Sequence, residues 1–225
     1  MNDSQIAELD SAQRVRTLLV GRPADVPAGS RAAALRDRIE TTITDIEQEA
    51  AKQLAASLDR QKATEQKQAA SKTLLEQMRS MNLTARSINP QFPGIADQFK
   101  MGRPASDQAM LDRARAFISL ATPTAAQFTS RGQPATFLTD MQATITAVEA
   151  AEALQSEANT RLSEATANLK AAFKTLRDDI SELDAIFKAK RRTDPGALAA
   201  WHTASHVEKA PKKAVAKKPT TPPSS

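Results

Sequence analysis

A seven-residue apolar repeat runs without a break from Leu138 to Phe187. Alternate steps of three and four residues from Leu138 reach fifteen positions, of which eleven are apolar. No strand pattern has this period, so the segment is predicted to form one long helix that packs along its length against other helices. The predicted helix-packing residues are Leu138, Met141, Ile145, Val148, Leu162, Leu169, Phe173, Leu176, Ile180, Leu183 and Phe187.

The composition supports a helical protein with a thin core. Ala, Leu, Gln, Glu, Lys and Arg dominate the 225 residues, and only 4% are aromatic. Such usage is typical of long helices and coiled coils. Cysteine is absent, which excludes disulfides, thiol nucleophiles and thiolate metal sites.

The sequence gives no indication of export or membrane insertion. The first residues lack the basic and apolar regions of a secretory signal. No stretch approaches the roughly 18 apolar residues that a membrane span requires. We therefore expect a soluble, cytoplasmic protein.

A second long helix is predicted to oppose the first. An initial helix over about 4–20 is followed by a loop at 21–29, which holds two Pro and two Gly. No Pro or Gly then occurs until Pro90, so helix is expected from about 30 to 86. The segment with the seven-residue repeat should form the other long helix, over about 134–191.

An antiparallel hairpin of these two helices would bring their polar stretches together. In such a hairpin residue 66 lies opposite about residue 154. Apolar residues are missing between Leu58 and Leu74 on one helix, apart from alanines. On the other helix the heptad positions are filled by Glu152, Gln155 and Asn159. These polar residues could select the helix register, form a polar pocket, or simply face solvent.

Shorter helices are expected near the ends of the pair. The segment 87–105 is broken by Pro and Gly but carries apolar residues, so it should lie against the helices. Ser106 can cap a helix over about 107–121, and a short helix should end near Gly132. Asp194 and Pro195 open a last helix to about Ser205. The predicted fold class is all-α, an elongated helical bundle built on a long antiparallel coiled-coil-like helix pair.

We expect a single domain over 1–206 and a disordered basic tail over 207–225. The tail carries five of the chain's lysines and one glutamate, against a net charge of +5 for the whole chain. After Glu208 it consists of Lys, Ala, Pro, Thr and Ser with a single Val, a composition that cannot build a core. The lysines are Lys209, Lys212, Lys213, Lys217 and Lys218.

Three stretches within roughly the last 130 residues, taken together, form a recognisable sequence pattern. They are Phe99-Lys100-Met101-Gly102-Arg103 with Ser106-Asp107-Gln108-Ala109-Met110-Leu111, then Ala114-Arg115-Ala116-Phe117, then Ala199-Ala200-Trp201 with His206-Val207-Glu208. The set resembles a family of uncharacterised, all-helical bacterial proteins. The resemblance implies a helical fold and no activity, cofactor or catalytic residue, and His202 is not part of the pattern.

Two groups of residues could bind a metal ion. His202 and His206 are four residues apart on a predicted helix and could share one ion, with Glu208 as the nearest third ligand. Alternatively they occupy an exposed helix end. The cluster Asp178, Asp179, Glu182 and Asp184 could hold a divalent cation, although a solvated face paired with Lys and Arg is the favoured interpretation.

The basic tail could contact nucleic acid through phosphates in a salt-sensitive way. It has no Arg and no aromatic residue, so contacts would be independent of base sequence. Alternatively the tail only increases solubility.

Sequence motifs of common enzymes are missing. There is no glycine-rich phosphate loop, nucleophile-elbow serine or His-Glu-x-x-His motif. The sequence therefore predicts a non-enzymatic structural or protein-interaction protein without a cofactor, with a protein partner or a second copy bound to its helices. A nucleic-acid-associated protein is the alternative, and a metal-dependent helical enzyme would require the histidine pair.

Overall fold

The computed structural model describes residues 1–102 and 106–208. Two long helices dominate it, α2 (Arg31–Ile88) and α6 (Phe137–Lys190). No strand occurs in the described residues, and the predicted all-α fold with α2 packed against α6 is confirmed. None of the helices described is both long and apolar enough to cross a membrane.

Cross-helix contacts show that α2 and α6 are antiparallel. Gln155 donates a hydrogen bond to Thr64 at 2.8 Å, and Arg161 lies 3.2 Å from Asp59. Residues further along α2 therefore meet residues earlier on α6. Residue 66 consequently lies opposite residues near 154, as the hairpin predicted.

The contacts of the chain are divided between two compact units. The first contains residues 1–53 and the chain from 164 on, and the second contains residues 54–163. Each unit has its own apolar core. The single domain expected over 1–206 stays a prediction. Both long helices contribute to each unit.

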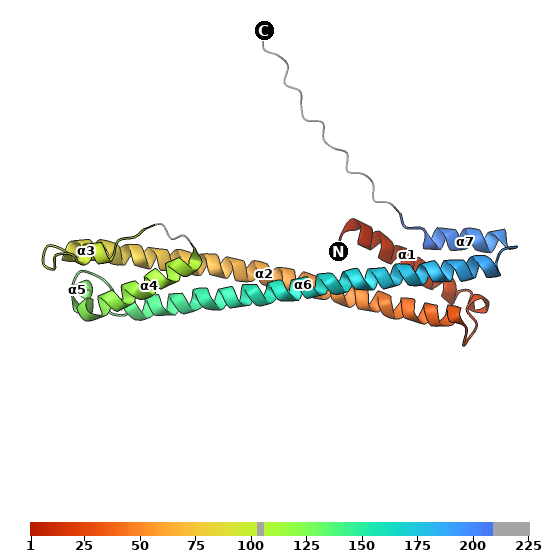
Figure 1. The fold of residues 1–225 in the computed structure, drawn as a ribbon, viewed down its shortest axis with the longest axis horizontal. Coiled ribbons are helices and arrows are strands. Elements are labelled where there is room, and N and C mark those ends of the chain that lie inside the picture. The colour runs from red at the N-terminus through yellow and green to blue at the C-terminus, as the bar shows by residue number, and fades with distance from the viewer. Residues whose placement is uncertain (103–105, 209–225) are drawn as a thin grey trace, which may run out of the picture. The chain divides into compact units, whose positions relative to one another are not determined.

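The first unit is built on one end of α2 and one end of α6, with α1 (Asp3–Val20) and α7 (Pro195–Ser205) packed on them (Figure 1). Its core includes Trp201, whose ring stacks on Phe187 with the centroids 4.7 Å apart. Asn2 caps α1 in a capping box with Gln5. Asp194 caps α7 as predicted.

A buried carboxylate fixes the loop after α1. Asp25 lies in the short 3-10 helix Pro23–Asp25 and is 3% exposed. Arg191 donates from Nε to its Oδ1 at 2.6 Å, and Lys190 donates to the carbonyl of Ala24 at 2.7 Å. The basic residues at the end of α6 therefore hold this loop in place.

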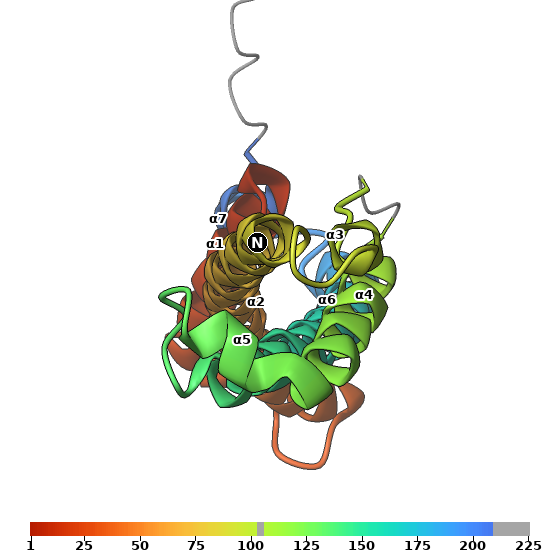
Figure 2. The ribbon, with the colours of Figure 1, turned by 90° about the vertical axis from the view of Figure 1, so that its left-hand side faces the viewer.

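The second unit contains the C-terminal part of α2 and the N-terminal part of α6. Its other elements are α3 (Ile95–Gln98), α4 (Asp107–Ala121), the 3-10 helix Thr122–Thr124 and α5 (Ala125–Thr129). Ser106 caps α4 as predicted, accepting a hydrogen bond from the amide of Ala109 at 3.1 Å. α3 and α5 lie at the end of the unit where α2 ends and α6 begins (Figure 1 and Figure 2).

Four phenylalanines form the centre of the second core. Phe99 lies 5.0 Å from Phe117 and 5.3 Å from Phe128, and Phe128 stacks on Phe137 at 5.6 Å. Asn82 donates to the carbonyl of Phe99 at 2.6 Å. The segment after α2 thus lies against the helices up to Gly102, as its apolar residues indicated.

The apolar heptad positions of α6 face the two cores. Three are partly buried, namely Leu138, Leu162 and Ile180. The remaining eight are buried, namely Met141, Ile145, Val148, Leu169, Phe173, Leu176, Leu183 and Phe187.

In the middle of α6 the buried seam moves by one residue. Ala151 and Ala158 are buried there, whereas Glu152 and Gln155 are only partly buried and Asn159 is exposed. The small alanine side chains at these neighbouring positions let the two helices pack closely where the heptad positions are polar. On α2 the buried residues are likewise alanines seven apart, Ala56 and Ala63.

Replacing Ala158 by leucine should therefore destabilise the second unit by about 1–3 kcal/mol, because the added atoms must be forced between two closely packed helices. Thermal and urea denaturation would measure the change. The matched control is Ala153→Leu, since Ala153 is exposed on the same helix and should tolerate the substitution. Equal stability of the two variants would contradict close packing at Ala158.

Candidate functional site

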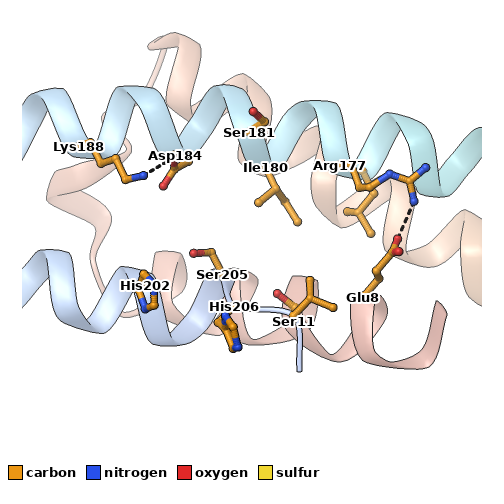
Figure 3. Close-up of a pocket in the computed structure, with 12 residues that line it drawn as sticks. Glu8, Ser11, Arg177, Ile180, Ser181, Asp184, Lys188, His202, Ser205 and His206 are labelled. Atoms are coloured by element: carbon orange, nitrogen blue, oxygen red, sulfur yellow. Dashed lines mark hydrogen bonds and ion pairs between the residues drawn. The ribbon is translucent and has the colours of Figure 1, made fainter. Parts of the chain in front are cut away.

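A pocket of about 350 Å³ opens among α1, α6 and α7 of the first unit (Figure 3). Its floor is apolar and includes Leu176 and Ile180. Its polar lining residues come from three helices: Glu8 and Ser11 on α1, Arg177, Ser181, Asp184 and Lys188 on α6, and His202 and Ser205 on α7, with His206 just after it.

Helical spacing places the α6 residues in one row. Arg177, Ser181, Asp184 and Lys188 follow one another at intervals of four, three and four residues, so they share a face of the helix. α7 runs alongside this face because Trp201 is anchored below it. The indole Nε1 of Trp201 donates to Asp184 at 2.8 Å. The same tryptophan that fills the core thus fixes the wall of the pocket.

The charges of the pocket are matched in pairs. Arg177 lies 2.8 Å from Glu8, and Lys188 lies 2.8 Å from Asp184. Both pairs are visible in Figure 3 as dashed lines across the pocket lining. A ligand in the pocket would therefore meet charges that already neutralise each other. These pairs would offer it hydrogen-bond donors and acceptors rather than a net electrostatic field.

The serine hydroxyls of the pocket are hydrogen-bonded to the backbone. Ser11 donates to the carbonyl of Ala204 at 3.2 Å, and Ser205 donates to the carbonyl of Trp201 at 2.9 Å. These bonds tie α1 to α7 and close the last turn of α7. Neither contact joins a hydroxyl to a general base, which is the arrangement that activates a serine nucleophile.

The two histidines stack on each other at the rim. Their rings lie 5.9 Å apart between centroids, with an angle of 17° between the planes. Arg14 donates to the backbone carbonyl of His206 at 2.7 Å. Within the described residues no three His, Asp or Glu side chains are placed to share a metal ion, so Glu208 does not complete the predicted set.

The acidic cluster of α6 is distributed over separate partners. Asp179 lies 2.7 Å from Arg38, and Glu182 accepts two hydrogen bonds of 2.6 Å from Arg31. Asp184 belongs to the pocket described above. Asp179, Glu182 and Asp184 thus pair with basic residues, as the favoured interpretation predicted. Asp179 is only 2% exposed, however, so it does not lie on a solvated face.

Burial raises the pKa of a carboxylate and pairing with arginine lowers it, and both effects act on Asp179 and Glu182. Burial raises the pKa of Asp179 above its usual 3.8, although the charge of Arg38 opposes the rise. One oxygen of Asp179, Oδ2, is buried without a hydrogen-bond partner among the described residues. The hydrogen bonds from Arg31 lower the pKa of Glu182 below 4.5.

The two carboxylates should therefore affect stability in opposite ways on acidification. Folded Asp179 takes up its proton at a higher pH than the unfolded chain does, so acidification favours the folded state through this group. Relative to Asp179→Asn, the wild type should gain stability as the pH falls from 7 towards about 4. Urea denaturation across this pH range would measure it.

Glu182→Gln is the matched control with the opposite sign. Because the folded-state pKa of Glu182 is lowered, the wild type should lose stability relative to this variant as the pH falls below about 4.5, so the urea series is extended to about pH 3. A pH-independent difference for Asp179→Asn would show that burial does not shift its titration.

The polar stretches in the second unit meet as the hairpin predicted. Lys67 of α2 lies 3.0 Å from Glu152 and 2.6 Å from Asp107, and these bonds raise the pKa of the Lys67 ammonium. Gln155 bonds to Thr64. A polar groove of about 600 Å³ lies beside them, lined by both long helices and including Asn159. These polar contacts cross between helices and so favour a fixed register.

Sequence reasoning missed the pocket and the ion pairs between distant segments. Glu8 and Arg177 are 169 residues apart, and no local pattern marks either as a partner of the other. The tail lysines 209, 212, 213, 217 and 218, proposed as phosphate contacts, lie outside the described residues.

Comparisons with known proteins found no relative of this chain. No family model matches the chain, and no curated protein or solved structure matches it. The resemblance to an all-helical bacterial family therefore stays a prediction.

Proposed function

We propose that this chain is a non-enzymatic interaction protein that binds a protein partner, or a second copy of itself, through the outward faces of its long helices. The observation that supports the proposal is the exposure of large apolar side chains on α2 in the second unit. Leu54 is 64% exposed and Leu58 is 58% exposed. They lie four residues apart and therefore share one face.

This face is opposite the buried alanine seam. Ala56, between the two leucines, is 3% exposed and points into the helix pair. Leaving apolar surface in water is unfavourable by about 25 cal/mol per Å², so covering both leucines would contribute to binding. Adjacent apolar residues on an exposed helix face are a common feature of helix-binding surfaces.

Affinity capture of the full-length protein from its native cells, with and without nuclease, tests the proposal. We expect a stoichiometric protein partner that survives nuclease and that is lost with the double variant Leu54→Ser, Leu58→Ser. Leu120→Ser is the matched control, because Leu120 is an exposed leucine on α4. Identical capture by both variants would contradict a role for this face.

The alternative function is association with nucleic acid through the basic C-terminal residues. It is supported by the five lysines after Glu208, which could neutralise phosphates without reading bases. Deleting residues 207–225 should then abolish salt-sensitive retention on DNA. Capture that disappears with nuclease would favour this alternative over the protein partner.

A further inference from the structure

A row of basic side chains follows the outer face of α2 in the second unit. Lys72, Arg79 and Arg86 are exposed and seven residues apart. Seven residues are close to two helical turns, so the three share one face, at a spacing of about 10.5 Å. Their neighbours towards the core, Leu74, Met78, Met81 and Ala85, are buried.

These three cations have no partner among the described residues. Their side chains form no ion pair or hydrogen bond there. By contrast, Lys67, Arg115 and Arg161 of the same unit each lie within 4 Å of a carboxylate. Glu76 is an exposed carboxylate on the same face, four residues after Lys72 and three before Arg79, and it forms no ion pair with any of the three among the described residues. The face thus carries three cations and one carboxylate, and its net charge is positive.

An exposed leucine lies within this row. Leu83 is 64% exposed and stands four residues after Arg79 and three before Arg86. The face therefore combines an apolar side chain with cations on both sides. Apolar anchors flanked by charges are typical of specific protein contacts, where the apolar group supplies affinity and the charges supply orientation.

We propose that the α2 face from Lys72 to Arg86 docks an acidic amphipathic helix of a protein partner. A helix with carboxylates every seven residues repeats them at about the same 10.5 Å spacing, so one partner helix can meet all three cations. Its apolar residues would cover Leu83. The inference rests on the proposed function, because it specifies which protein chemistry the helical surface recognises.

Nucleic acid fits this face less well. Phosphates would satisfy the cations but would leave Leu83 without an apolar partner. An acidic helix uses both features of the face. A duplex DNA of similar charge is consequently the proper competitor in the test.

The test measures binding of a labelled synthetic helix to the full-length protein by fluorescence anisotropy. The probe has about three heptads, with Glu at every seventh position and Leu on the same face. We expect saturable binding, at least about tenfold weaker for Lys72→Glu, Arg79→Glu, Arg86→Glu, and weaker also for Leu83→Ser. A probe with Lys in place of Glu should not bind.

The matched control is Lys170→Glu, Lys174→Glu on α6, which reverses two exposed lysines of the first unit that form no ion pair within residues 1–102 and 106–208. It should bind the probe as the wild type does, and thermal melting should show that all variants fold. Absence of probe binding, equal binding by the charge-reversed variant, or preferential binding of the duplex would each overturn the inference. Nuclease-resistant capture retained by that variant would leave the proposed function standing.

Discussion

Leu176→Glu is expected to unfold the first unit at room temperature. Leu176 is 1% exposed within the core that joins α1, α2, α6 and α7. The substitution removes apolar packing worth about 2–5 kcal/mol and places a carboxylate where it has no water. The total is comparable with the about 5–15 kcal/mol that stabilises a whole domain.

The only tryptophan of the chain reports on this unit. Trp201 is 1% exposed, so its fluorescence should move to the wavelength of solvated indole in the variant. Thr175→Glu is the control, because Thr175 is the exposed neighbour of Leu176 and should accept the charge. A native melting temperature and native mass in Leu176→Glu would refute the assignment of Leu176 to the buried core of this unit.

Phe99→Ala should have the largest effect in the second unit, with a loss of about 3–5 kcal/mol in the free energy of unfolding. Phe99 is fully buried and contacts Phe117 and Phe128 through its ring. Truncation leaves a cavity between α4 and α5 that rigid helices cannot close. It also removes the side chain that anchors the segment after α2.

Far-UV circular dichroism during urea denaturation would measure this loss. Phe92→Ala is the matched control, because Phe92 lies in the same segment but is 41% exposed, and its truncation should cost less than about 1 kcal/mol. If the two variants were equally stable, the aromatic cluster would not be the centre of the unit. Fluorescence of Trp201 would show whether the first unit unfolds with the second.

The sequence predicted the elements whose signals are local. The caps of α4 and α7 were found because Ser106 and Asp194 precede their helices directly. The hairpin was found because polar stretches on two helices coincide. The alanine seam was missed because heptad counting reaches Glu152 and Asn159, whereas the buried residues are the alanines one position earlier, Ala151 and Ala158.

Long-range contacts had no comparable signal. Arg191 and Asp25 are 166 residues apart, and Arg38 meets Asp179 across a similar separation. Each of these residues resembles an ordinary surface charge when only its neighbours in sequence are seen. Burial of the two aspartates depends on how α1, α2, α6 and α7 pack, which no single segment determines.

The division of the chain into two units has a consequence for the order of folding during synthesis. Residues 54–163 are contiguous, so the second unit can assemble as soon as they have left the ribosome. The first unit must wait for the chain beyond residue 164. Joining its halves across a free loop of this length would cost about 4 kcal/mol in chain entropy. A second unit that is already folded holds Asp59 beside Arg161 and so removes much of that cost. Residues 54–163, once folded, would thereby lower the entropic cost of bringing the two parts of the first unit together.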